Sequence, residues 1–426
     1  MNAFDKVIGY ESIKTELLQI CDMIHNKEIY INLGARMPRG ILLYGDPGLG
    51  KTLMAKCFIE ESGLKTFTLR RNKRADDFVD EITETFRRAR RDAPAIVFLD
   101  DMDKFANEDD RHRDAEEYVA IQAGIDESRG AEVFVLATAN DIDKLPESLL
   151  RSGRFDRKIE VENPSSAEAF HIIRHYLADK RVSPDVNLED LFMMLNYSSC
   201  ADLEMVLNEA AIYSGYARKS HITMQELVEA VLRVEYAAPD NCAEVSAEEL
   251  RKVALHEAGH LVICEVLYPG CVGLASLRKK GCSVAGGFVR RCKRFEDDAY
   301  DVLAALGGKA AVELYYAEGC AGGCRSDIGK AIRSIRSSVS RDGRCGVGLL
   351  DVEARRTPIM SEDLNARSEA VVQAELERYL FKAREILLKN KGFLEDVATV
   401  LLEKETLLYS DIRELRESAE ITEVFI

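Results

Sequence analysis

The sequence predicts an α/β module with a parallel sheet, followed by a small helical module and then a larger, mainly α-helical module. Short apolar runs alternate with helical patterns up to about residue 160, which is typical of a parallel sheet covered on both faces. Only helical patterns follow the Asn163-Pro164 pair, and a second break lies at residues 237–241. We therefore expect modules over residues 1–160, 161–237 and 243–426.

Each expected element has the length and pattern of its type. The strands of the first module are apolar runs at residues 41–44, 66–69, 95–99 and 133–136. Amphipathic helical patterns lie between them, at residues 52–61, 78–91 and 115–127. The second module has helical patterns at 167–178, 201–217 and 223–234, and the third is helical apart from a strand-like stretch at 271–290. No apolar run approaches the roughly 20 residues of a membrane span, so we expect none.

Charge and cysteine content exclude several classes of protein. The chain has 58 Lys and Arg against 74 Asp and Glu, a net charge of −16, which argues against nucleic acid or anionic lipid as the main ligand. Its 11 cysteines are an odd number at irregular spacings, unlike a secreted disulfide framework. The first residues carry no signal-peptide pattern. The sequence predicts a cytoplasmic protein.

A phosphate-binding pattern, G-x-x-x-x-G-K-[ST], lies between an apolar strand and a helix, which is the context that raises this motif above chance. Its residues are Gly45, Asp46, Pro47, Gly48, Leu49, Gly50, Lys51 and Thr52. The glycines let backbone N–H groups turn inward around the phosphates, and the helix N-terminus adds partial positive charge. We expect Lys51 to pair with the β- and γ-phosphates and Thr52 to ligate Mg²⁺. The segment thus predicts ATP binding.

Polar residues follow two further predicted strands of this module. Asp100 and Asp101 end the apolar run 95–99, where Asp100 would hold Mg²⁺ and Asp101 would polarise the attacking water. Asn140 ends the next apolar strand and is suited to orienting a water by the γ-phosphate. Arg151 and Arg154 follow, and arginines at such a point can cross a subunit boundary to neutralise transition-state charge. The alternative is that both arginines simply lie on a solvent-exposed face of the protein.

The third module contains H-E-x-x-H in a helical, apolar context. The spacing puts His256 and His260 on one helix face, where both imidazoles can bind one Zn²⁺. Glu257 lies beside them, placed to take a proton from the attacking water. His171 and His175 have the same spacing without the Glu, and we expect no metal there. Catalytic zinc needs a third protein ligand, which spacing alone does not identify.

The first two modules resemble an AAA-type ATPase. The resemblance runs from residues 4–9 through the phosphate loop to residues 154–157, and includes residues 199–203 and 208–211. It implies a helical lid, a first-sensor role for Asn140 and arginine-finger roles for Arg151 and Arg154. It also implies that the nucleotide is contacted by Ile8, Gly9, His175 and Ala201. Such ATPases usually work as hexameric rings.

The whole chain, from about residue 4 to 415, resembles the FtsH-type family, in which an AAA ATPase is fused to a zinc peptidase. Residues 306–313 match the family's Gly-Gly-Arg-x-Ala-Glu-Glu helix, and residues 323–328 match its Gly-Ala-x-x-Asp-Leu segment. The Asp of that segment is the third zinc ligand, which by resemblance is Asp327. Residues 286–288 resemble the strand that holds extended substrate by β-augmentation. The resemblance implies polypeptide substrates, with Zn²⁺, ATP and Mg²⁺ as cofactors.

The sequence departs from that family in several places. Asp101 stands where the family has Glu, and because its carboxylate is one methylene shorter we expect slow ATP hydrolysis. The substrate-gripping aromatic has no counterpart near residues 74–76, and Phe78 is either its replacement or a core residue. Cys324 stands where the family has Ala. Cys320 and Cys324 are small residues of a tight turn or a thiol pair that disturbs the zinc loop.

These observations predict an ATP-dependent zinc metalloendopeptidase that degrades unfolded or loosely folded proteins, working as a homo-hexamer. Two alternatives stay open. One is a non-proteolytic AAA chaperone with a structural zinc site, against which the base Glu257 speaks. The other is a protease whose ATPase half only senses nucleotide, which the short side chain of Asp101 favours.

Overall fold

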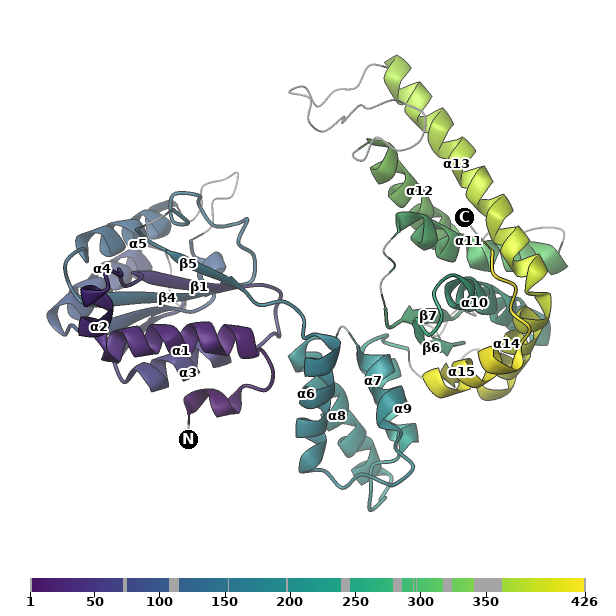
Figure 1. Cartoon of the computed structure of the whole chain (residues 1–426), viewed down its shortest axis with the longest axis horizontal. Helices are drawn as coiled ribbons and strands as arrows, with labels where there is room; N and C mark the ends of the chain where they lie inside the picture. Colours follow the sequence, from purple (N-terminus) through teal and green to yellow (C-terminus); the bar gives the residue numbers. More distant parts are fainter. Residues whose placement is uncertain are drawn as a thin grey trace. The chain divides into compact units, whose positions relative to one another are not determined.

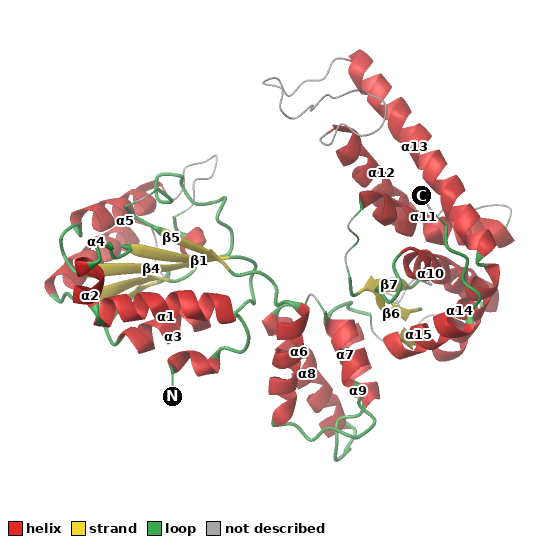
Figure 2. Cartoon of the chain, in the orientation of Figure 1, coloured by secondary structure: helices red, strands yellow, loops and turns green. Residues whose placement is uncertain are grey.

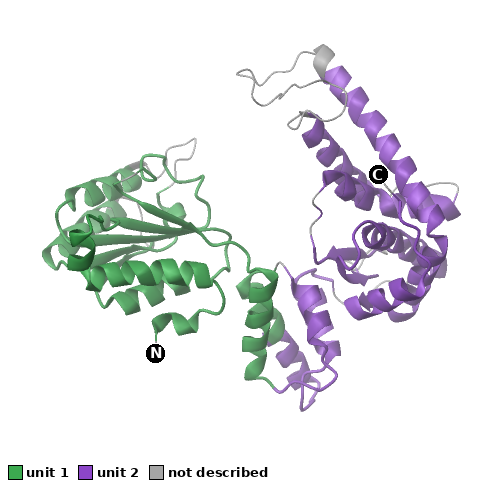
Figure 3. Ribbon diagram, viewed as in Figure 1, with its two compact units in different colours: residues 1–180, 197–207 green, residues 181–196, 208–426 purple. Residues whose placement is uncertain are grey.

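The computed structural model describes two compact units of the chain. The described residues are 2–71, 75–106, 115–151, 153–196, 198–238, 246–278, 286–293, 295, 297–316, 324–340 and 362–424. The first unit comprises residues 1–180 and 197–207, and the second residues 181–196 and 208–426, as Figure 3 shows. Each unit has a hydrophobic core of its own.

The first unit contains the predicted parallel sheet. Its strands are β1 (Gly40–Tyr44), β2 (Lys65–Leu69), β3 (Ala95–Leu99), β4 (Val133–Ala139) and β5 (Arg157–Glu160). They lie in the order β2-β3-β4-β1-β5, and every neighbouring pair is parallel. β5 was not expected, because of its four residues only Ile159 is buried and the strand has no apolar run. It pairs with β1 at the edge of the sheet, where polar residues are tolerated.

Helices cover both faces of this sheet (Figures 1 and 2). Side chains alternate along β3, so that Ile96 and Phe98 join one core and Val97 and Leu99 the other. The first core is closed by η1 (Ala3–Lys6), α1 (Glu11–His25) and α3 (Lys51–Ser62), and the second by α4 (Ala75–Arg91), η2 (Met102–Lys104) and α5 (Ala115–Glu127). The short helix α2 (Lys27–Asn32) follows α1. Phe78 is fully buried in the second core, so the candidate gripping aromatic packs inside the module.

The helical segment after the sheet divides between the two units. The expected helices are present as α6 (Ser166–Ala178), α8 (Cys200–Tyr216) and α9 (Met224–Val234), with a further helix, α7 (Leu188–Leu195). α6 belongs to the first unit, α7 and α9 belong to the second, and α8 begins in the first and ends in the second. The boundaries at residues 160 and 237 stay predictions.

The second unit is mainly helical, as predicted. Its helices are α10 (Ala247–Leu267), α11 (Asp298–Tyr315), α12 (Arg325–Ser340), α13 (Glu362–Lys389), α14 (Lys391–Lys404) and α15 (Tyr409–Ser418). An antiparallel sheet has the order β7-β6-β8, formed by β6 (Val272–Ser276), β7 (Phe288–Arg291) and β8 (Thr406–Leu408). The strand-like stretch at 271–290 supplies β6 and most of β7. Three-residue β8 was not expected, because it is too short to give a periodic signal.

α10 and α11 position the second site because they cross at very close range. A Cβ atom on Gly259 would lie 2.4 Å from the carbonyl oxygen of Gly307, and one on Gly307 would lie 2.6 Å from that of Gly259. Only glycine fits both positions at this separation of the two backbones. α10 is buried along most of its length. Even so, neither it nor any other helix within the described ranges is long and apolar enough to cross a membrane.

Candidate active sites

The first site lies in the loop between β1 and α3. Gly45 has φ +140°, and a Cβ atom there would lie 2.1 Å from the carbonyl oxygen of Val161, so this turn requires glycine. Lys51 is buried, and its Nζ donates hydrogen bonds of 2.6 Å to the carbonyl oxygens of both Gly45 and Asp46. Burial lowers the pKa of Lys51. The loop therefore holds its ammonium group inside the turn that the sequence assigns to phosphate.

The predicted magnesium ligands lie next to one another. Thr52 Oγ1 donates to Asp100 Oδ1 at 3.1 Å, joining the start of α3 to the end of β3. Thr138 on β4 donates to the same Oδ1 atom at 3.0 Å, and its Oγ1 accepts from the N–H of Asp101 at 2.9 Å. Thr138 was not among the predicted residues, although it lies two residues before Asn140 at the same edge of the sheet. This hydroxyl therefore contacts the carboxylate of Asp100 and the backbone of Asp101.

Asp101 is engaged by cations of its own unit. Its backbone has φ +56°, in the left-handed region, where aspartate is tolerated better than most residues. Lys104 Nζ lies 2.7 Å from Asp101 Oδ2, and Arg70 Nη2 lies 3.6 Å from the same oxygen. Arg70 Nε is also 3.8 Å from Asp100 Oδ2. Neither Arg70 nor Lys104 was predicted for this site, because long cationic side chains give no sequence signal of what they contact.

Asn140, Arg151 and Arg154 have different surroundings. The N–H of Asn140 donates to Asp103 Oδ1 at 3.0 Å, which fixes the backbone at the end of β4. Arg154 is held inside its own unit, because Nη2 lies 2.8 Å from Asp126 Oδ2 and Nη1 donates to the carbonyl oxygen of Ser148. Arg151 is largely exposed and has a loose 3.5 Å contact with Glu147. Of the two arginines, Arg151 has the side chain that is free to extend outward.

The residues assigned to the nucleotide by resemblance lie at different places. Ala201 N–H donates to the carbonyl oxygen of Gly48 at 3.0 Å, so the start of α8 contacts the phosphate loop. Ile8 and Gly9 are half-buried, and a Cβ atom on Gly9 would contact Glu168 of α6 at 3.1 Å. His175 packs edge-on against Tyr176 with ring centroids 5.5 Å apart. Within the described residues, no hydrogen bond or ion pair joins His175 to the loop.

The second site is built on α10, α11 and the start of α12. α10 begins with a capping box, in which Ser246 and Glu249 bond to each other's backbone N–H groups. About two turns beyond Glu249, His256 and His260 lie on the same face, with their Nε2 atoms 3.1 Å apart. Asp327, on the first turn of α12, places Oδ2 3.3 Å from His256 Nε2 and 3.6 Å from His260 Nε2. The structure thus brings together the three predicted metal ligands.

The spacing of these ligand atoms fits zinc. All three lie within 4.8 Å of one another. Nitrogen and oxygen ligands about 2.0–2.2 Å from a tetrahedral zinc are roughly 3.3–3.6 Å apart, close to the distances found here. His260 Nδ1 lies 2.6 Å from the carbonyl oxygen of Ala304, which fixes the N–H on Nδ1 and leaves the Nε2 lone pair for a metal. Lys330 Nζ lies 3.1 Å from the other oxygen of Asp327.

The pKa values of the three groups reflect their mutual contacts. Burial opposes a charge on His256 and His260, but hydrogen bonds to Asp327, together with the other acceptors and charges around the rings, outweigh it and raise both pKa values. Burial likewise opposes the charge on Asp327, yet its hydrogen bonds to the two imidazoles hold its pKa well below the ordinary range. The site therefore stabilises an ionised carboxylate between two cation-forming groups, an arrangement that a divalent metal would also satisfy.

Glu257 is buried, and two glycines shape its surroundings and those of the imidazoles. Burial raises the pKa of Glu257, the direction expected of a general base that must accept a proton near neutral pH. A Cβ atom on Gly287, just before β7, would lie 2.6 Å from Glu257 Cγ. One on Gly308 of α11 would lie 2.4 Å from His256 Cε1 and 2.5 Å from His260 Nε2. The missing side chains leave room for the catalytic groups, which sequence spacing does not reveal.

The site opens into a cleft of about 1060 Å³. One wall is the segment before and along β7, which pairs with β6 and lies at the end of the sheet order, so its outer edge has no partner strand among the described residues. Phe288 of β7 stacks on Tyr236 with ring centroids 4.1 Å apart, which holds the strand in place. Cys324 is buried beside the site, with Sγ 4.0 Å from His256 Nδ1. Cys320 lies outside the described residues, so the thiol-pair hypothesis is not tested.

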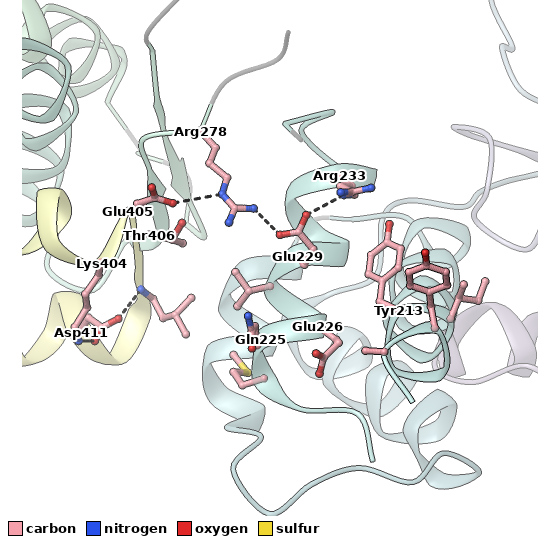
Figure 4. Close-up of a pocket in the computed structure, with 16 residues that line it drawn as sticks. Tyr213, Gln225, Glu226, Glu229, Arg233, Arg278, Lys404, Glu405, Thr406 and Asp411 are labelled. Atoms are coloured by element: carbon pink, nitrogen blue, oxygen red, sulfur yellow. Dashed lines mark hydrogen bonds and ion pairs between the residues drawn. The ribbon is translucent and has the colours of Figure 1, made fainter. Parts of the chain in front are cut away.

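A second cavity, of about 940 Å³, lies within the second unit between the α8–α9 hairpin and β8 (Figure 4). Glu229 of α9 accepts from Arg233 at 2.8 Å and also from Arg278, which follows β6. Arg278 Nε lies 3.9 Å from Glu405, beside β8. These ion pairs connect α9 to the small sheet, and none of the predicted site residues lines this cavity.

The chain matches two family models. One describes the "ATPase family associated with various cellular activities (AAA)" and matches residues 41–163. The other describes "Peptidase family M41" and matches residues 291–415. The first range holds the phosphate loop, Asp100, Asp101, Asn140 and the two arginines, and the second holds Asp327. The H-E-x-x-H pair precedes the second range.

Curated relatives resemble the chain along almost all of its length. An ATP-dependent zinc metalloprotease, FtsH 2 of Symbiobacterium thermophilum, is 33% identical over 438 residues, covering 97% of this chain and 74% of the relative. FtsH of Ureaplasma parvum is 32% identical over 436 residues, covering 96% of this chain and 60% of the relative. FtsH of Caldicellulosiruptor bescii is 31% identical over 446 residues, covering 97% of this chain and 71% of the relative. The similarity therefore includes both sites and the segment between them.

Proposed function

The chain belongs to the FtsH family of ATP-dependent zinc metalloproteases, and from this premise we propose which of its residues perform each reaction. We assign peptide-bond hydrolysis to the cleft beside α10, where His256, His260 and Asp327 would hold zinc and Glu257 would be the general base. The observation that carries this assignment is the convergence of the three ligand atoms within 4.8 Å of one another, next to a buried carboxylate.

A bound Zn²⁺ would supply Lewis acidity that activates a water and polarises the scissile carbonyl. Glu257 would accept the proton that this water loses as its oxygen bonds to the carbonyl carbon. The same carboxyl group would then give the proton to the leaving amine as the C–N bond breaks. The raised pKa of Glu257, due first to burial, suits both steps. Gly287 has no side chain beside Glu257, which supports an unobstructed approach to the carboxylate.

The edge of β7 is the proposed binding place for substrate. Main-chain N–H and C=O groups on an unpaired strand edge can bind an extended peptide of almost any sequence. Residues 286–289 line the cleft beside the metal-binding face, so such a peptide would cross the zinc site. An extended conformation is available to unfolded or loosely folded polypeptides, which are the substrates we propose.

The first unit would bind and hydrolyse ATP. A bound Mg²⁺ would supply positive charge that offsets the negative charge developing on the transferred phosphoryl group. Lys51 would exchange its bonds to the loop carbonyls for phosphate oxygens, and Thr52 and Asp100, which are hydrogen-bonded to each other, would hold the cation or its waters. Asp101 would orient the attacking water together with Asn140. Hydrolysis would drive movement of polypeptide toward the cleft.

We further propose that the chain works as a homo-hexameric ring in the cytoplasm. The exposed side chain of Arg151 supports an arginine finger that reaches a neighbouring subunit's nucleotide, whereas Arg154 is held by Asp126. The seven cysteines within the described residues are free thiols, which suits a reducing compartment. Native mass measurement with and without nucleotide tests the ring, and a monomer under both conditions would contradict it.

A second candidate function is supported by one observation. Lys104 and Arg70 engage Asp101, which would hold its short carboxylate away from a water at the γ-phosphate. In that case the ATPase half would sense nucleotide while the protease works without sustained hydrolysis. The chaperone alternative, with a purely structural zinc, has less support because a structural site has no use for Glu257.

Casein degradation separates these functions. The full chain should degrade casein with ATP, degrade it much more slowly without ATP, and fail to degrade it as Glu257→Gln. Equal degradation with and without ATP, abolished only in Glu257→Gln, would favour the nucleotide-sensing protease. Absence of degradation in every arm, at normal ATP hydrolysis, would favour the chaperone.

A further inference from the structure

The two zinc-binding imidazoles differ in what holds their second nitrogen. His260 Nδ1 lies 2.6 Å from the carbonyl oxygen of Ala304, a strong acceptor fixed in the backbone of α11. For His256, the hydrogen-bond partner found at Nδ1 is the sulfur of Cys324, 4.0 Å away. Because both Nε2 atoms face Asp327, the two Nδ1 atoms must carry the ring N–H groups when a metal is bound.

The partner of that second nitrogen matters for metal binding. A ligating histidine almost always donates its other N–H to a carboxylate, a carbonyl or a water, and this bond fixes the tautomer and the ring orientation. The thiol of Cys324 is only 3% exposed. The sulfur thus occupies the position next to Nδ1 where another histidine ligand would have an oxygen acceptor.

Cys324 also has a favourable place in the chain. It immediately precedes α12, and its carbonyl oxygen accepts from the N–H of Ile328 at 2.9 Å. Asp327 follows three residues later, so both side chains lie on the same side of one helical turn. A single turn therefore presents a carboxylate to Nε2 of His256 and a sulfur to Nδ1 of the same ring.

We propose that Cys324 is a positioning residue of the zinc site, whose sulfur accepts the Nδ1–H of His256 and so orients this imidazole for the metal. This inference rests on the proposed zinc site. Cys324 does not touch zinc or substrate in this assignment, and it acts only through His256. The resemblance to the FtsH-type family places alanine here, which has no acceptor, so the contact is a feature of this chain.

Zinc affinity of the full chain tests the proposal directly. Chelator competition with a chromophoric indicator is measured for the unsubstituted chain, Cys324→Ala, Cys324→Ser and the control Cys292→Ala. Cys292 is a buried thiol of the same unit whose sulfur contacts backbone carbonyls of residues 270 and 271. We expect Cys324→Ala to bind zinc about 10- to 100-fold more weakly. Cys324→Ser, which keeps an acceptor, should recover much of that loss, and Cys292→Ala should bind zinc normally.

The other outcomes contradict either the positioning role of Cys324 or the zinc site itself. Normal zinc affinity in Cys324→Ala, or equal losses in Cys324→Ala and Cys324→Ser at unchanged unfolding midpoints, would refute the positioning role. Cobalt substitution gives an independent readout, because a sulfur-to-cobalt charge-transfer band that is present in the unsubstituted chain and lost in Cys324→Ala would make Cys324 a direct ligand and also refute it. An unsubstituted chain that binds no zinc would instead refute the zinc site of the proposed function.

Discussion

At the scale of single residues, the zinc site depends on side chains that are absent as much as on those that are present. Gly308 lies against both imidazole rings, and Gly287 lies against the carboxylate of Glu257. A histidine pair at i and i+4 could be found in the sequence, because it carries chemistry at a recognisable spacing. A glycine that makes space has no reactive group and no such spacing. Its role becomes visible only in the structure, where α10 and α11 cross.

Gly308→Ala should strongly weaken zinc binding while leaving the chain folded. The added methyl would lie 2.4 Å from His256 Cε1 and 2.5 Å from His260 Nε2, so at least one ring must rotate away. The expected result is a loss of about 100-fold or more in zinc affinity, measured by chelator competition. Gly392→Ala in α14 is the matched control, because a Cβ atom there meets nothing within 4 Å. Equal zinc affinity in both variants would contradict the close contact.

As the pH is lowered, zinc affinity should begin to fall at a higher pH than it would for histidines with ordinary pKa values. Hydrogen bonds to Asp327 raise the pKa values of His256 and His260 above their ordinary 6.5 despite burial, so protons occupy the ligands at a higher pH. Zinc must displace these protons, and its apparent affinity decreases as pH is lowered. Asp327, whose pKa is low, stays ionised and adds nothing to this dependence. Affinity that is constant between about pH 8 and pH 6 would contradict this.

Asp101→Glu should raise ATP turnover. Lys104 Nζ lies 2.7 Å from the carboxylate of Asp101, and one more methylene would give this carboxylate a longer reach. A misplacement of about 1 Å near the chemistry can lower a rate by about 100-fold, which sets the upper limit of the gain. Steady-state phosphate release is the measurement, with Asp101→Asn as the inactive control. Turnover that stays the same or drops in Asp101→Glu would refute the explanation of slow hydrolysis.

The proposed third zinc ligand shows where residue-level prediction depends on family resemblance. Many carboxylates follow His260, and spacing does not distinguish them, because the third ligand comes from a different helix. Resemblance identified Asp327, and the structure brings its Oδ2 to the two Nε2 atoms. Thr138, Arg70 and Lys104 were not predicted, because hydroxyls and long cations have no spacing that indicates their partners.

At the scale of elements, the sequence predicted long periodic segments well and short ones poorly. The four apolar strands and their intervening helices of the first unit are present, because burial on both faces gives continuous apolar runs. β5 and β8 were missed, since a strand of three or four mostly exposed residues has no pattern. α7 lies in the segment that was expected to be helical throughout, but its bounds were not predicted, because eight residues are too few for a clear helical period.

α7 is held to the second unit by a buried carboxylate. Asp190 accepts from both the N–H and the hydroxyl of Ser410, at 2.8 Å each. Asp190→Ala should therefore lower the free energy of unfolding of the full chain by about 2–3 kcal/mol, because a charged acceptor with two hydrogen bonds is lost. Urea unfolding gives the value.

The neighbouring Glu189→Ala is the control for that substitution. Glu189 pairs with Arg413 at 3.2 Å, but both side chains are about half exposed, so its removal should change stability by less than about 1 kcal/mol. Equal effects of the two substitutions would show that the Asp190 contacts do not hold α7 in place.

At the scale of the whole molecule, the chain carries two chemical centres in two compact units, with α8 passing from one unit to the other. Each centre is nearly complete by itself, since the phosphate loop with Asp100 lies in the first unit and the metal ligands with Glu257 lie in the second. This separation predicts that one activity can be removed without loss of the other. It also explains why the motifs of each half were recognisable independently. The ion pairs of Figure 4, which join α9 to the small sheet, belong to no motif and were not predicted.

The assignment of His256, His260 and Asp327 to zinc and of Glu257 to proton transfer is tested by the number of zinc ions bound per chain, measured for the unsubstituted chain, Glu257→Gln and Asp327→Asn. We expect one zinc in the unsubstituted chain and one in Glu257→Gln, which should nevertheless cleave no casein. Asp327→Asn should bind zinc far more weakly and also fail to cleave, while all three chains hydrolyse ATP. Full zinc occupancy with casein cleavage in Asp327→Asn, or cleavage by Glu257→Gln, would contradict it.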